Sequence, residues 1–538
     1  MDKTENILIG NELHLPIPVV NVGQLLYDEL KNRNQEDIAF KSYLTDESNT
    51  VGQILNNSLK LAQAFTELEL TTKDLVAICA NNHINYPIIA LAALYSGIPL
   101  ALMNPAYTTY EFENLFKIVE AKIVFCSEMN LETLLQVKSK SNTIRKLVVI
   151  DQQDINNKDA ISLENFLKST NSNFKVKEIN TKEQIAFIMF SSGTTGLPKA
   201  VALTHHNVNA TLIAIEHPAV GIPQDMGITL GVLPFFHIYG FYQQIQALKK
   251  SIPMIVMEHF NPFDYLQCIE KYKLATLIGV PPLINFLAKS SIIDDYDLSS
   301  LKDITCGSAP IGEDVLLLVK NRLKLDTVRN AYGSTEAHMV IATTPLGSTI
   351  NKSVGKIATA TTLCIRDIET GKNLPANQQG EICTKSEMMM KGYYKNEIAT
   401  KESFTEDGFL KSGDIGYYDE DGYIYVVDRL KEFIKYKGFQ VAPAELEAVL
   451  MKNEKIADVG VVGKPDQAAG EIPIAFVVKA EAVDLSEDEV KKYLEQFLSK
   501  HKYLHAVYFV DVIPRTPSGK IIRRELKGLL KKLTECKL

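Results

Sequence analysis

The segment 191–199 carries the strongest chemical signal in the sequence. It reads Ser-Ser-Gly-Thr-Thr-Gly-Leu-Pro-Lys, between the apolar run 185–190 and the helix-like run 206–216. Glycines allow close backbone approach, and hydroxyls, free N–H groups and a lysine form a cradle for an anion. The GxxxxGK[ST] spacing of a Walker A loop is absent. The pattern predicts a phosphate site, with a polar hairpin turn as the alternative. The candidate residues are Ser191, Ser192, Gly193, Thr194, Thr195, Gly196 and Lys199.

The chain around this loop has the composition of a large globular protein. Its 538 residues exceed the roughly 100–200 residues of one ordinary domain. Apolar residues make up 46% and charged residues 23%, which excludes collagen-like and disordered chains. The net charge of −8 gives no reason to expect nucleic acid as a partner. Seven cysteines without CxxC spacing favour a reducing compartment over a disulfide framework.

No segment predicts membrane insertion or secretion. The N-terminus lacks the apolar stretch of a secretory signal. Residues 86–103 carry no charge, but a spanning helix needs about 20 apolar residues. Gly97 and Pro99 stop a helix near Ser96. We therefore expect a buried helix of about ten residues, followed by a buried strand at 98–103.

The elements that must position the loop follow an alternating strand–helix rhythm, which is typical of parallel α/β sheets covered on both faces. This rhythm occurs before and after residue 180 and predicts two α/β subdomains. From about residue 345, short strands separated by Gly, Asn and Asp predict a small, β-barrel-like antiparallel unit. After residue 430 we expect a compact α+β tail, which divides the chain into 1–430 and 431–538. The expected strands are 75–80, 122–126, 146–150, 185–190, 228–233, 254–257, 276–280, 303–306, 362–367, 380–384, 422–427, 459–463 and 474–478, and the expected helices 111–119, 206–216, 445–451 and 487–498.

The loop at 191–199 resembles the signature loop of the acyl-adenylate-forming enzymes. This superfamily includes acyl-CoA synthetases, 4-coumarate–CoA ligases, insect luciferases and peptide-synthetase adenylation domains. The resemblance extends through several ordered motifs from about residue 50 to 525. It is strongest to 4-coumarate–CoA ligase-like proteins and beetle luciferase-like acyl-CoA synthetases. The resemblance implies a large N-terminal body and a small, mobile C-terminal domain.

The resemblance also implies a nucleotide site. Residues 330–336, Asn-Ala-Tyr-Gly-Ser-Thr-Glu, are similar to the family's GYGxTE motif, and 412–416 to its SGD motif. By this likeness the aromatic ring stacks on adenine, the threonine contacts the α-phosphate and the aspartate binds both ribose hydroxyls. A hard Mg²⁺ ion prefers carboxylate and phosphate oxygens, which suits the glutamate. The implied nucleotide residues are Ser308, Ala309, Pro310, Ala331, Tyr332, Gly333, Thr335, Asp414 and Arg429, with Glu336 and Thr195 as metal ligands.

The remaining motifs concern the two chemical steps. Residues 514–520 resemble the loop whose lysine, here Lys520, completes adenylation. Residues 431–445 resemble the ligase hinge region, which implies Lys431 as hinge and assigns Lys435 and Gln440 to the ligase active site. Residues 234–240 resemble the ligase segment whose histidine, here His237, lies beside the acyl site.

Two pocket positions depart from the family pattern. Ala331 stands where glycine is usual, and its methyl group disfavours a flat aromatic ring. Tyr239 replaces a small residue of the beetle luciferases, which disfavours efficient light emission.

Together these motifs predict an ATP-dependent carboxylate–CoA ligase that uses ATP, Mg²⁺ and coenzyme A. The expected acid is a medium- or long-chain fatty acid, with arylpropenoic acids second. A luciferase-like oxygenase and a non-catalytic nucleotide-binding scaffold are the alternatives. The C-terminal Cys536-Lys537-Leu538 resembles variants of the peroxisomal Ser-Lys-Leu address. It predicts a peroxisomal location and an import receptor as partner.

Overall fold

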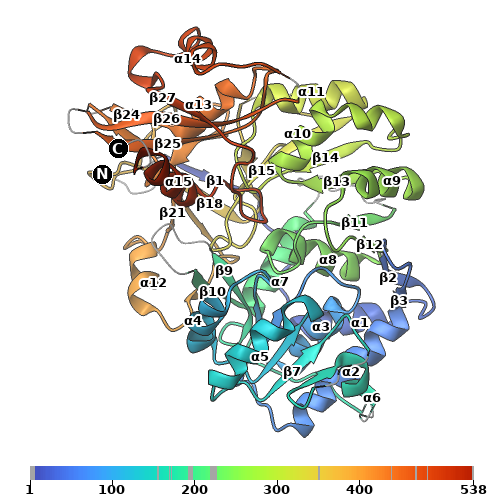
Figure 1. Cartoon of the computed structure of the whole chain (residues 1–538). Helices are drawn as coiled ribbons and strands as arrows, with labels where there is room; N and C mark the ends of the chain where they lie inside the picture. The colour runs from blue at the N-terminus through green and yellow to red at the C-terminus, as the bar shows by residue number, and fades with distance from the viewer. Residues whose placement is uncertain are drawn as a thin grey trace.

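The computed structural model describes residues 6–153, 155, 157–168, 170, 173–191, 198–217, 227–348, 352–437, 439–466, 469–481 and 483–535. Within these residues the strands form four sheets, with helices on their faces (Figure 1). The fold is the expected mixed α/β architecture, with a large N-terminal body and a smaller C-terminal domain. In the described part of the chain, every helix is too short or too polar to span a bilayer.

The first sheet lies in the lower part of Figure 1. Its parallel strands β5, β4, β6, β7 and β8 agree with the predicted strand–helix rhythm. In order across the sheet, the described strands are β20 (Gly392–Tyr393), β10 (Lys199–Thr204), β9 (Ile185–Ser191), β5 (Leu100–Leu102), β4 (Val76–Cys79), β6 (Ile123–Cys126), β7 (Lys146–Val149) and β8 (Ala160–Ser162). The accompanying helices are α1 (Val22–Lys31), α2 (Val51–Glu67), α3 (Tyr86–Ser96), α4 (Thr109–Val119), α5 (Leu131–Lys140) and α6 (Leu163–Lys168), with the 3-10 turn η1 (Glu128–Asn130).

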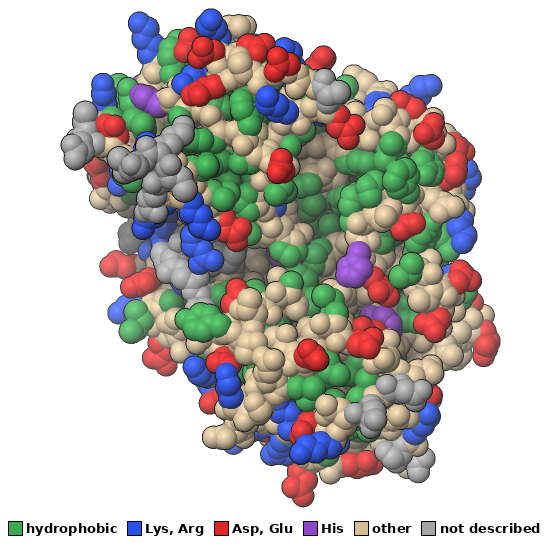
Figure 2. All heavy atoms as spheres, viewed as in Figure 1, with side chains coloured by type: hydrophobic (Ala, Val, Ile, Leu, Met, Phe, Trp, Pro, Cys, Tyr) green, Lys and Arg blue, Asp and Glu red, His purple; other side chains and the backbone are tan. Residues whose placement is uncertain are grey.

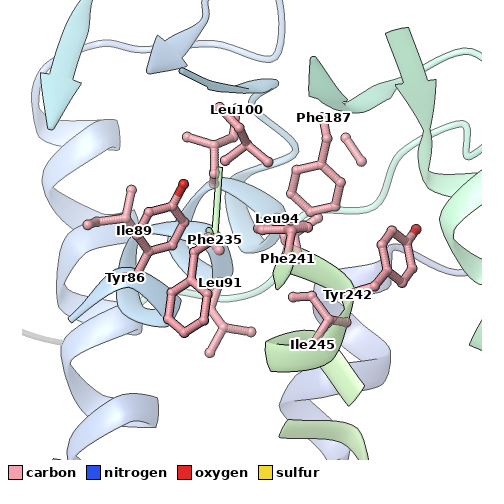
Figure 3. Close-up of a cluster of buried hydrophobic side chains, with 14 of the residues drawn as sticks. Tyr86, Ile89, Leu91, Leu94, Leu100, Phe187, Phe235, Phe241, Tyr242 and Ile245 are labelled. Carbon is pink, nitrogen blue, oxygen red and sulfur yellow. The ribbon is translucent and has the colours of Figure 1, made fainter. Parts of the chain in front are cut away.

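Helix α3 confirms the prediction of a short buried helix. All of its residues are buried, and it ends at Gly97, whose φ of +61° is the left-handed conformation common after a helix. Figure 3 shows its side chains facing those of α8 (Ile238–Lys250), with Phe241 and Ile245 directed into the shared core. One face of α8 is thereby fixed against α3, which leaves another face free to line a site.

The body also contains a small sheet and a long one. The small sheet has the order β11 (Thr229–Gly231), β12 (Met254–Val256), β2 (Ile38–Ser42), β3 (Ser48–Thr50). The long sheet has the order β1 (Ile7–Ile9), β18 (Thr361–Arg366), β19 (Gly380–Ser386), β21 (Leu410–Tyr418), β22 (Tyr423–Arg429), β17 (Gly355–Ile357), β16 (Ala342–Thr343), β15 (Thr327–Tyr332), β14 (Asp303–Cys306), β13 (Thr276–Gly279). The helices of this part of the chain are α7 (His205–Ile215), α8, α9 (Pro262–Tyr272), α10 (Pro281–Lys289), α11 (Glu313–Leu323) and α12 (Glu397–Ser403), with the 3-10 turn η3 (Ser291–Asp295).

The strand pairing corrects two details of the sequence interpretation. Strand β9, expected to begin the second α/β subdomain, belongs to the first sheet, where it pairs in parallel with β5. The antiparallel strands expected after residue 345 are present, and they continue the parallel sheet of β13–β15 through β16 and β17. Local patterns specify where a strand lies but not its partner, because pairing depends on contacts between distant residues.

A third correction concerns the loop at 191–199. The sequence suggested that a helix follows it, but β10 comes first and pairs antiparallel with β9, with Lys199 opposite Ser191. The loop therefore joins two strands of a hairpin, and the predicted helix at 206–216 is present as α7, which begins at His205. Residues 192–197 lie outside the described residues.

The C-terminal domain has its own sheet and core. Its described strands are β24 (Phe439–Val441), β23 (Ile434–Tyr436), β26 (Gly470–Lys479), β25 (Ile456–Asp466) and β27 (Ala506–Phe509). Its helices are α13 (Pro443–Leu450), α14 (Glu487–Glu495) and α15 (Arg523–Glu535), with the 3-10 turn η4 (Lys500–Lys502). The ion pair Lys452–Asp314 (2.7 Å) and the hydrogen bond from Lys289 Nζ to the Met451 carbonyl (2.9 Å) join it to α11 and α10. The division at residue 430 stays a prediction.

Candidate functional site

The site lies where the C-terminal domain meets the long sheet. Figure 2 shows this face hollowed between the two parts, with hydrophobic side chains gathered over α10 and α11. Three features from different elements make up the site: a buried carboxylate on β21, a lysine loop from the C-terminal domain and a cavity beside α8.

Asp414 is the buried carboxylate, with 7% of its surface exposed. Strands β21 and β22 place it opposite Arg429, whose Nε lies 3.4 Å from Oδ1. Tyr332, at the end of β15, donates its hydroxyl to Oδ2 at 2.6 Å. Burial raises the pKa of Asp414, and Arg429 partly opposes this shift. A carboxylate has about four acceptor positions, so Asp414 retains capacity for further donors such as ribose hydroxyls.

Lys520 is held in a tight loop. Its backbone N–H donates to Thr516 Oγ1 (3.1 Å), and its carbonyl accepts from the Thr516 N–H (2.7 Å). Arg515 donates to the Gly519 carbonyl (2.8 Å) and pairs with Asp458 on β25 (2.6 Å), which anchors the loop to the C-terminal sheet.

The loop also reaches the body of the protein. The Cα of Gly519, with φ of +83°, faces Pro282 at the start of α10, where an added Cβ would lie 3.1 Å from Pro282 Cδ. A side chain at this position would therefore be strained and crowded.

The surroundings of Lys520 lower its basicity. Burial lowers the pKa of Lys520 to about 8, and Arg429 acts in the same direction, while Asp414 and Glu336 partly oppose it. The structure thus joins Lys520, Arg429, Asp414 and Glu336 in one electrostatic cluster, as the sequence motifs imply. A cluster with two cations and two carboxylates suits a ligand that carries phosphate and hydroxyl groups.

Glu336 and Lys199 are linked through a residue that the sequence motifs did not identify. Tyr393 on β20 donates its hydroxyl to Glu336 Oε1 at 3.1 Å, and Lys199 Nζ lies 4.7 Å from the centre of the same ring. Strand β20 pairs with β10, which carries Lys199. Among the described residues no three His, Cys, Asp or Glu side chains are grouped to hold a metal. Glu336 alone still fits Mg²⁺, which is often bound by one carboxylate together with substrate phosphates.

The adenine-side loop predicted from the sequence follows β14. Ser308 has φ of +79°, and its buried hydroxyl has no hydrogen-bond partner among the described residues. At the preceding Gly307, an added Cβ would lie 3.2 Å from the Ala331 carbonyl and 3.4 Å from the Tyr239 ring. The loop therefore packs against both predicted pocket residues. The loops that follow β14 and β15 carry four further predicted nucleotide residues, Ala309, Pro310, Gly333 and Thr335.

His237 lies at the N-terminus of α8. Its Nδ1 accepts the Tyr239 N–H at 3.4 Å, so the ring caps the helix. Burial lowers the pKa of His237 to about 3, and the charge of Lys520 acts in the same direction. The ring is therefore neutral near pH 7 and suits orienting a ligand rather than supplying charge.

A cavity lies beyond His237, between α8 and strands β13–β15. It includes Tyr239 and Ala331, as predicted, and several polar residues that sequence reasoning missed, among them Gln243, Gln246, Asp303 and Arg329. The glutamines follow Tyr239 at helical spacing, a signal present in the sequence. Nothing in the sequence marks Asp303, in the expected strand 303–306, or Arg329 as a cavity residue.

Three predicted residues are not joined to this cluster. Lys435 lies on β23 with an exposed side chain, opposite Gln440 on β24 of the C-terminal sheet. Lys431 is exposed between β22 and β23. Of the phosphate loop, Ser191 ends β9 and Lys199 begins β10, while Ser192, Gly193, Thr194, Thr195 and Gly196 lie outside the described residues.

Comparisons with known proteins show what the chain is similar to. The family model of AMP-binding enzymes matches residues 28–394, and the model of the AMP-binding enzyme C-terminal domain matches residues 445–520. Luciferin 4-monooxygenase of Photuris pensylvanica is 37% identical over 98% of this chain and 99% of its own length. 4-Coumarate–CoA ligase 1 of Petroselinum crispum is 33% identical over 90% of this chain and 89% of its own length. The solved structure of a natural red-emitting luciferase from Phrixothrix hirtus superposes with a TM-score of 0.72 at 33% identity, over 98% of this chain and 99% of that one.

Proposed function

We propose, from the premise that the chain belongs to the AMP-binding enzyme family, that it is an ATP-dependent carboxylate–CoA ligase. The observation that carries the proposal is the placement of Lys520 beside Asp414, Arg429 and Glu336, together with a cavity beside α8. This placement brings together a cation, a carboxylate that can bind ribose and a carboxylate that can bind a metal. A carboxylic acid can enter beside them. Such an arrangement suits the transfer of an adenylyl group.

In the first step, a carboxylate oxygen of the acid attacks the α-phosphorus of ATP, and pyrophosphate leaves. Lys520 stabilises the negative charge that develops on the α-phosphate, and Asp414 holds the ribose. Glu336 and Thr195 are the residues that would hold Mg²⁺, which when bound neutralises phosphate charge. Neutral His237 orients the acid at the cavity entrance.

In the second step, the sulfur of the CoA thiol attacks the acyl carbon, and AMP leaves with the original carboxylate oxygen. Lys435 is exposed in this structure, so it cannot act at the same time as Lys520. We propose that rotation of the C-terminal domain about Lys431 replaces Lys520 with Lys435 and Gln440. A hinge of this kind needs only a few loop residues that absorb a dihedral change.

A panel of carboxylic acids tests the proposed function. Fatty acids of medium and long chain and arylpropenoic acids, each with ATP, Mg²⁺ and CoA, should include at least one acid that yields AMP and an acyl-CoA thioester. Mass spectrometry of the thioester identifies the product. If no acid supports ATP–pyrophosphate exchange, a non-catalytic nucleotide-binding scaffold becomes the better account.

A luciferase-like oxygenase is the second candidate, and the 37% identity to a luciferin 4-monooxygenase favours it. Photon counting with luciferin, ATP, Mg²⁺ and O₂ separates the two functions. Light without any acyl-CoA product from the acid panel would favour the oxygenase.

The pH dependence of adenylation should follow the state of Lys520. Its pKa is lowered to about 8, so its stabilising charge is present below pH 8 and is lost as the pH rises above it. We expect kcat/KM for acid-dependent ATP–pyrophosphate exchange, which reports on the free enzyme, to fall above about pH 8. A Lys520→Arg variant stays charged over this pH range, so its kcat/KM should not fall above about pH 8. A wild-type profile that is flat from pH 7 to 10 would contradict the assignment.

We also propose a peroxisomal location, based on Cys536-Lys537-Leu538, which lies outside the described residues. A fluorescent fusion with the native C-terminus should enter peroxisomes, and deletion of these three residues should leave it in the cytosol. Import of the shortened fusion would contradict the proposal.

A further inference from the structure

The turn that carries Thr335 and Glu336 has an unusual backbone. Two successive residues near its end, His338 and Met339, have φ of +58° and +95°, and neither is glycine. This left-handed region is unfavourable for most residues other than glycine, although histidine tolerates it better than most. Such strain persists only where the surrounding structure imposes it, and it gathers at functional sites. The contacts that impose it here therefore indicate what the turn is built to hold.

The turn closes on itself before the chain returns to the sheet. The Met339 N–H donates to the Ser334 carbonyl at 3.0 Å. The Met339 carbonyl lies so close to Gly333 that a side chain at Gly333 would collide with it. Because the turn is closed and its inside is filled, the left-handed residues cannot relax to a common backbone conformation without moving Glu336.

The ring of His338 is fully buried and is bonded through both of its nitrogens. Nδ1 lies 2.9 Å from Thr211 Oγ1 on α7 and 3.0 Å from the Met388 carbonyl oxygen. Thr211 donates its own proton to the Asn207 carbonyl (2.9 Å), so both partners of Nδ1 accept and Nδ1 carries the proton. Nε2 bonds to the Tyr242 hydroxyl of α8, which Figure 3 shows directed away from the labelled residues of α3. Three separate elements therefore fix the orientation of the ring.

The segment that accepts a hydrogen bond from His338 also holds Glu336. Residues 387–390 form the turn between β19 and β20. Within this turn, the Met390 N–H donates to the Glu336 carbonyl at 2.8 Å. Tyr393, on β20 just beyond the turn, donates to the Glu336 carboxylate. The backbone and the side chain of Glu336 thus depend on the same stretch of chain as the His338 ring.

We propose that His338 is a positioning residue, whose ring locks the left-handed turn and so holds Glu336 in the nucleotide cluster. It lies two residues beyond the motif at 330–336 and acts only through Glu336. The inference rests on the proposed function, because that function gives Glu336 its role toward phosphates and Mg²⁺. His338 also lines the cavity, so a direct role toward the acid is the alternative that the test must separate.

Binding of α,β-methylene-ATP, which cannot donate its adenylyl group, tests the inference without acid or CoA. Calorimetry compares its Kd with and without Mg²⁺. His338→Asn keeps a donor and tolerates the left-handed region, so its Kd with Mg²⁺ should stay within about threefold of the wild-type value. His338→Leu fills the space but can neither donate nor adopt this backbone easily, and should raise that Kd about 10-fold or more.

A glycine variant separates locking from packing. His338→Gly adopts the left-handed backbone without strain but fills less space than leucine. Its Kd with Mg²⁺ should therefore lie between those of the asparagine and leucine variants. A residue that only fills space would give the opposite order, with glycine worse than leucine, and that order would overturn the inference.

A double-mutant cycle shows whether the effect passes through Glu336. In a Glu336→Gln background, His338→Leu should raise the Kd with Mg²⁺ less than about twofold, because its route of action is already removed. His205→Leu is the matched control. His205 is also a buried histidine, but its Nδ1 accepts the Val22 N–H (3.2 Å), and its variant should bind as the wild type does. If His338→Leu does not fold, Tyr242→Phe removes one partner of the ring and should show the same dependence on Glu336.

The nucleotide analogue also separates this inference from the proposed function. If no acid in the panel is activated, the ligase assignment fails, while Mg²⁺-dependent binding of the analogue and its loss in His338→Leu still support the inference. Additive losses in the cycle, an unchanged Kd in His338→Leu, or a wild-type Kd that does not depend on Mg²⁺ would overturn it. An effect of His338→Leu confined to the KM for the acid would overturn it as well.

Discussion

Replacing Lys520 with alanine should lower acid-dependent ATP–pyrophosphate exchange by about 100- to 1,000-fold, as is usual when a group that stabilises transition-state charge is removed. The lysine lies in one electrostatic cluster with Asp414, Arg429 and Glu336, where the α-phosphate is expected. Formation of acyl-CoA from supplied acyl-AMP should be nearly unchanged, because Lys520 is assigned to the first step only. Rapid-quench measurement of each half-reaction checks both statements.

A Lys435→Ala variant is the matched control. Lys435 is also a lysine of the C-terminal domain, but its side chain is exposed on β23. It should keep exchange near the wild-type rate and lose thioester formation. Equal loss of both half-reactions in Lys520→Ala would contradict the division of labour between the two lysines.

Replacing Asp414 with alanine should raise the KM for ATP by about 100-fold. The carboxylate is assigned to two ribose hydroxyls, and losing two such charged hydrogen bonds costs about 3 kcal/mol or more. The change also leaves the Tyr332 hydroxyl and the Arg429 guanidinium without their partner, so the melting temperature should fall as well. Initial rates at varied ATP and thermal unfolding measure the two effects.

The KM for the acid separates a local effect from a general loss of structure. It should change little in Asp414→Ala, since the cavity lies on the other side of β15. Asp414→Asn keeps one oxygen acceptor, so its KM for ATP should lie between the values of the wild type and the alanine variant. An unchanged KM for ATP in the alanine variant would remove Asp414 from the nucleotide site.

Strand and helix positions were predictable because their signals are local. The apolar run that forms α3, bounded by Gly97 and Pro99, specified a buried helix without any knowledge of its neighbours. Strand β10 was missed because the polar loop before it and the helix after it dominated the pattern. The sheet to which β9 belongs could not be derived either, since its partner β5 is distant in sequence.

The same distinction holds for the site. Motifs predicted Lys520, Asp414, Arg429, Glu336 and Tyr332, and the structure brings these residues together. Tyr393 was missed because it reaches Glu336 only through the pairing of β20 with β10. The spacing of Gln243 and Gln246 is visible in the sequence, yet only packing of α8 against α3 shows which side of the helix meets the cavity. Asp303 and Arg329 acquire meaning only when β14 and β15 pair.

The central claim, that the acid is activated as an acyl-adenylate and then transferred to CoA, is tested most directly by isotope transfer. An acid from the panel is labelled with ¹⁸O in both carboxylate oxygens, and the products are analysed by mass spectrometry. Attack of the carboxylate on the α-phosphorus predicts one labelled oxygen in AMP, one in the thioester carbonyl and none in pyrophosphate. Unlabelled AMP, or label in pyrophosphate, would contradict this account.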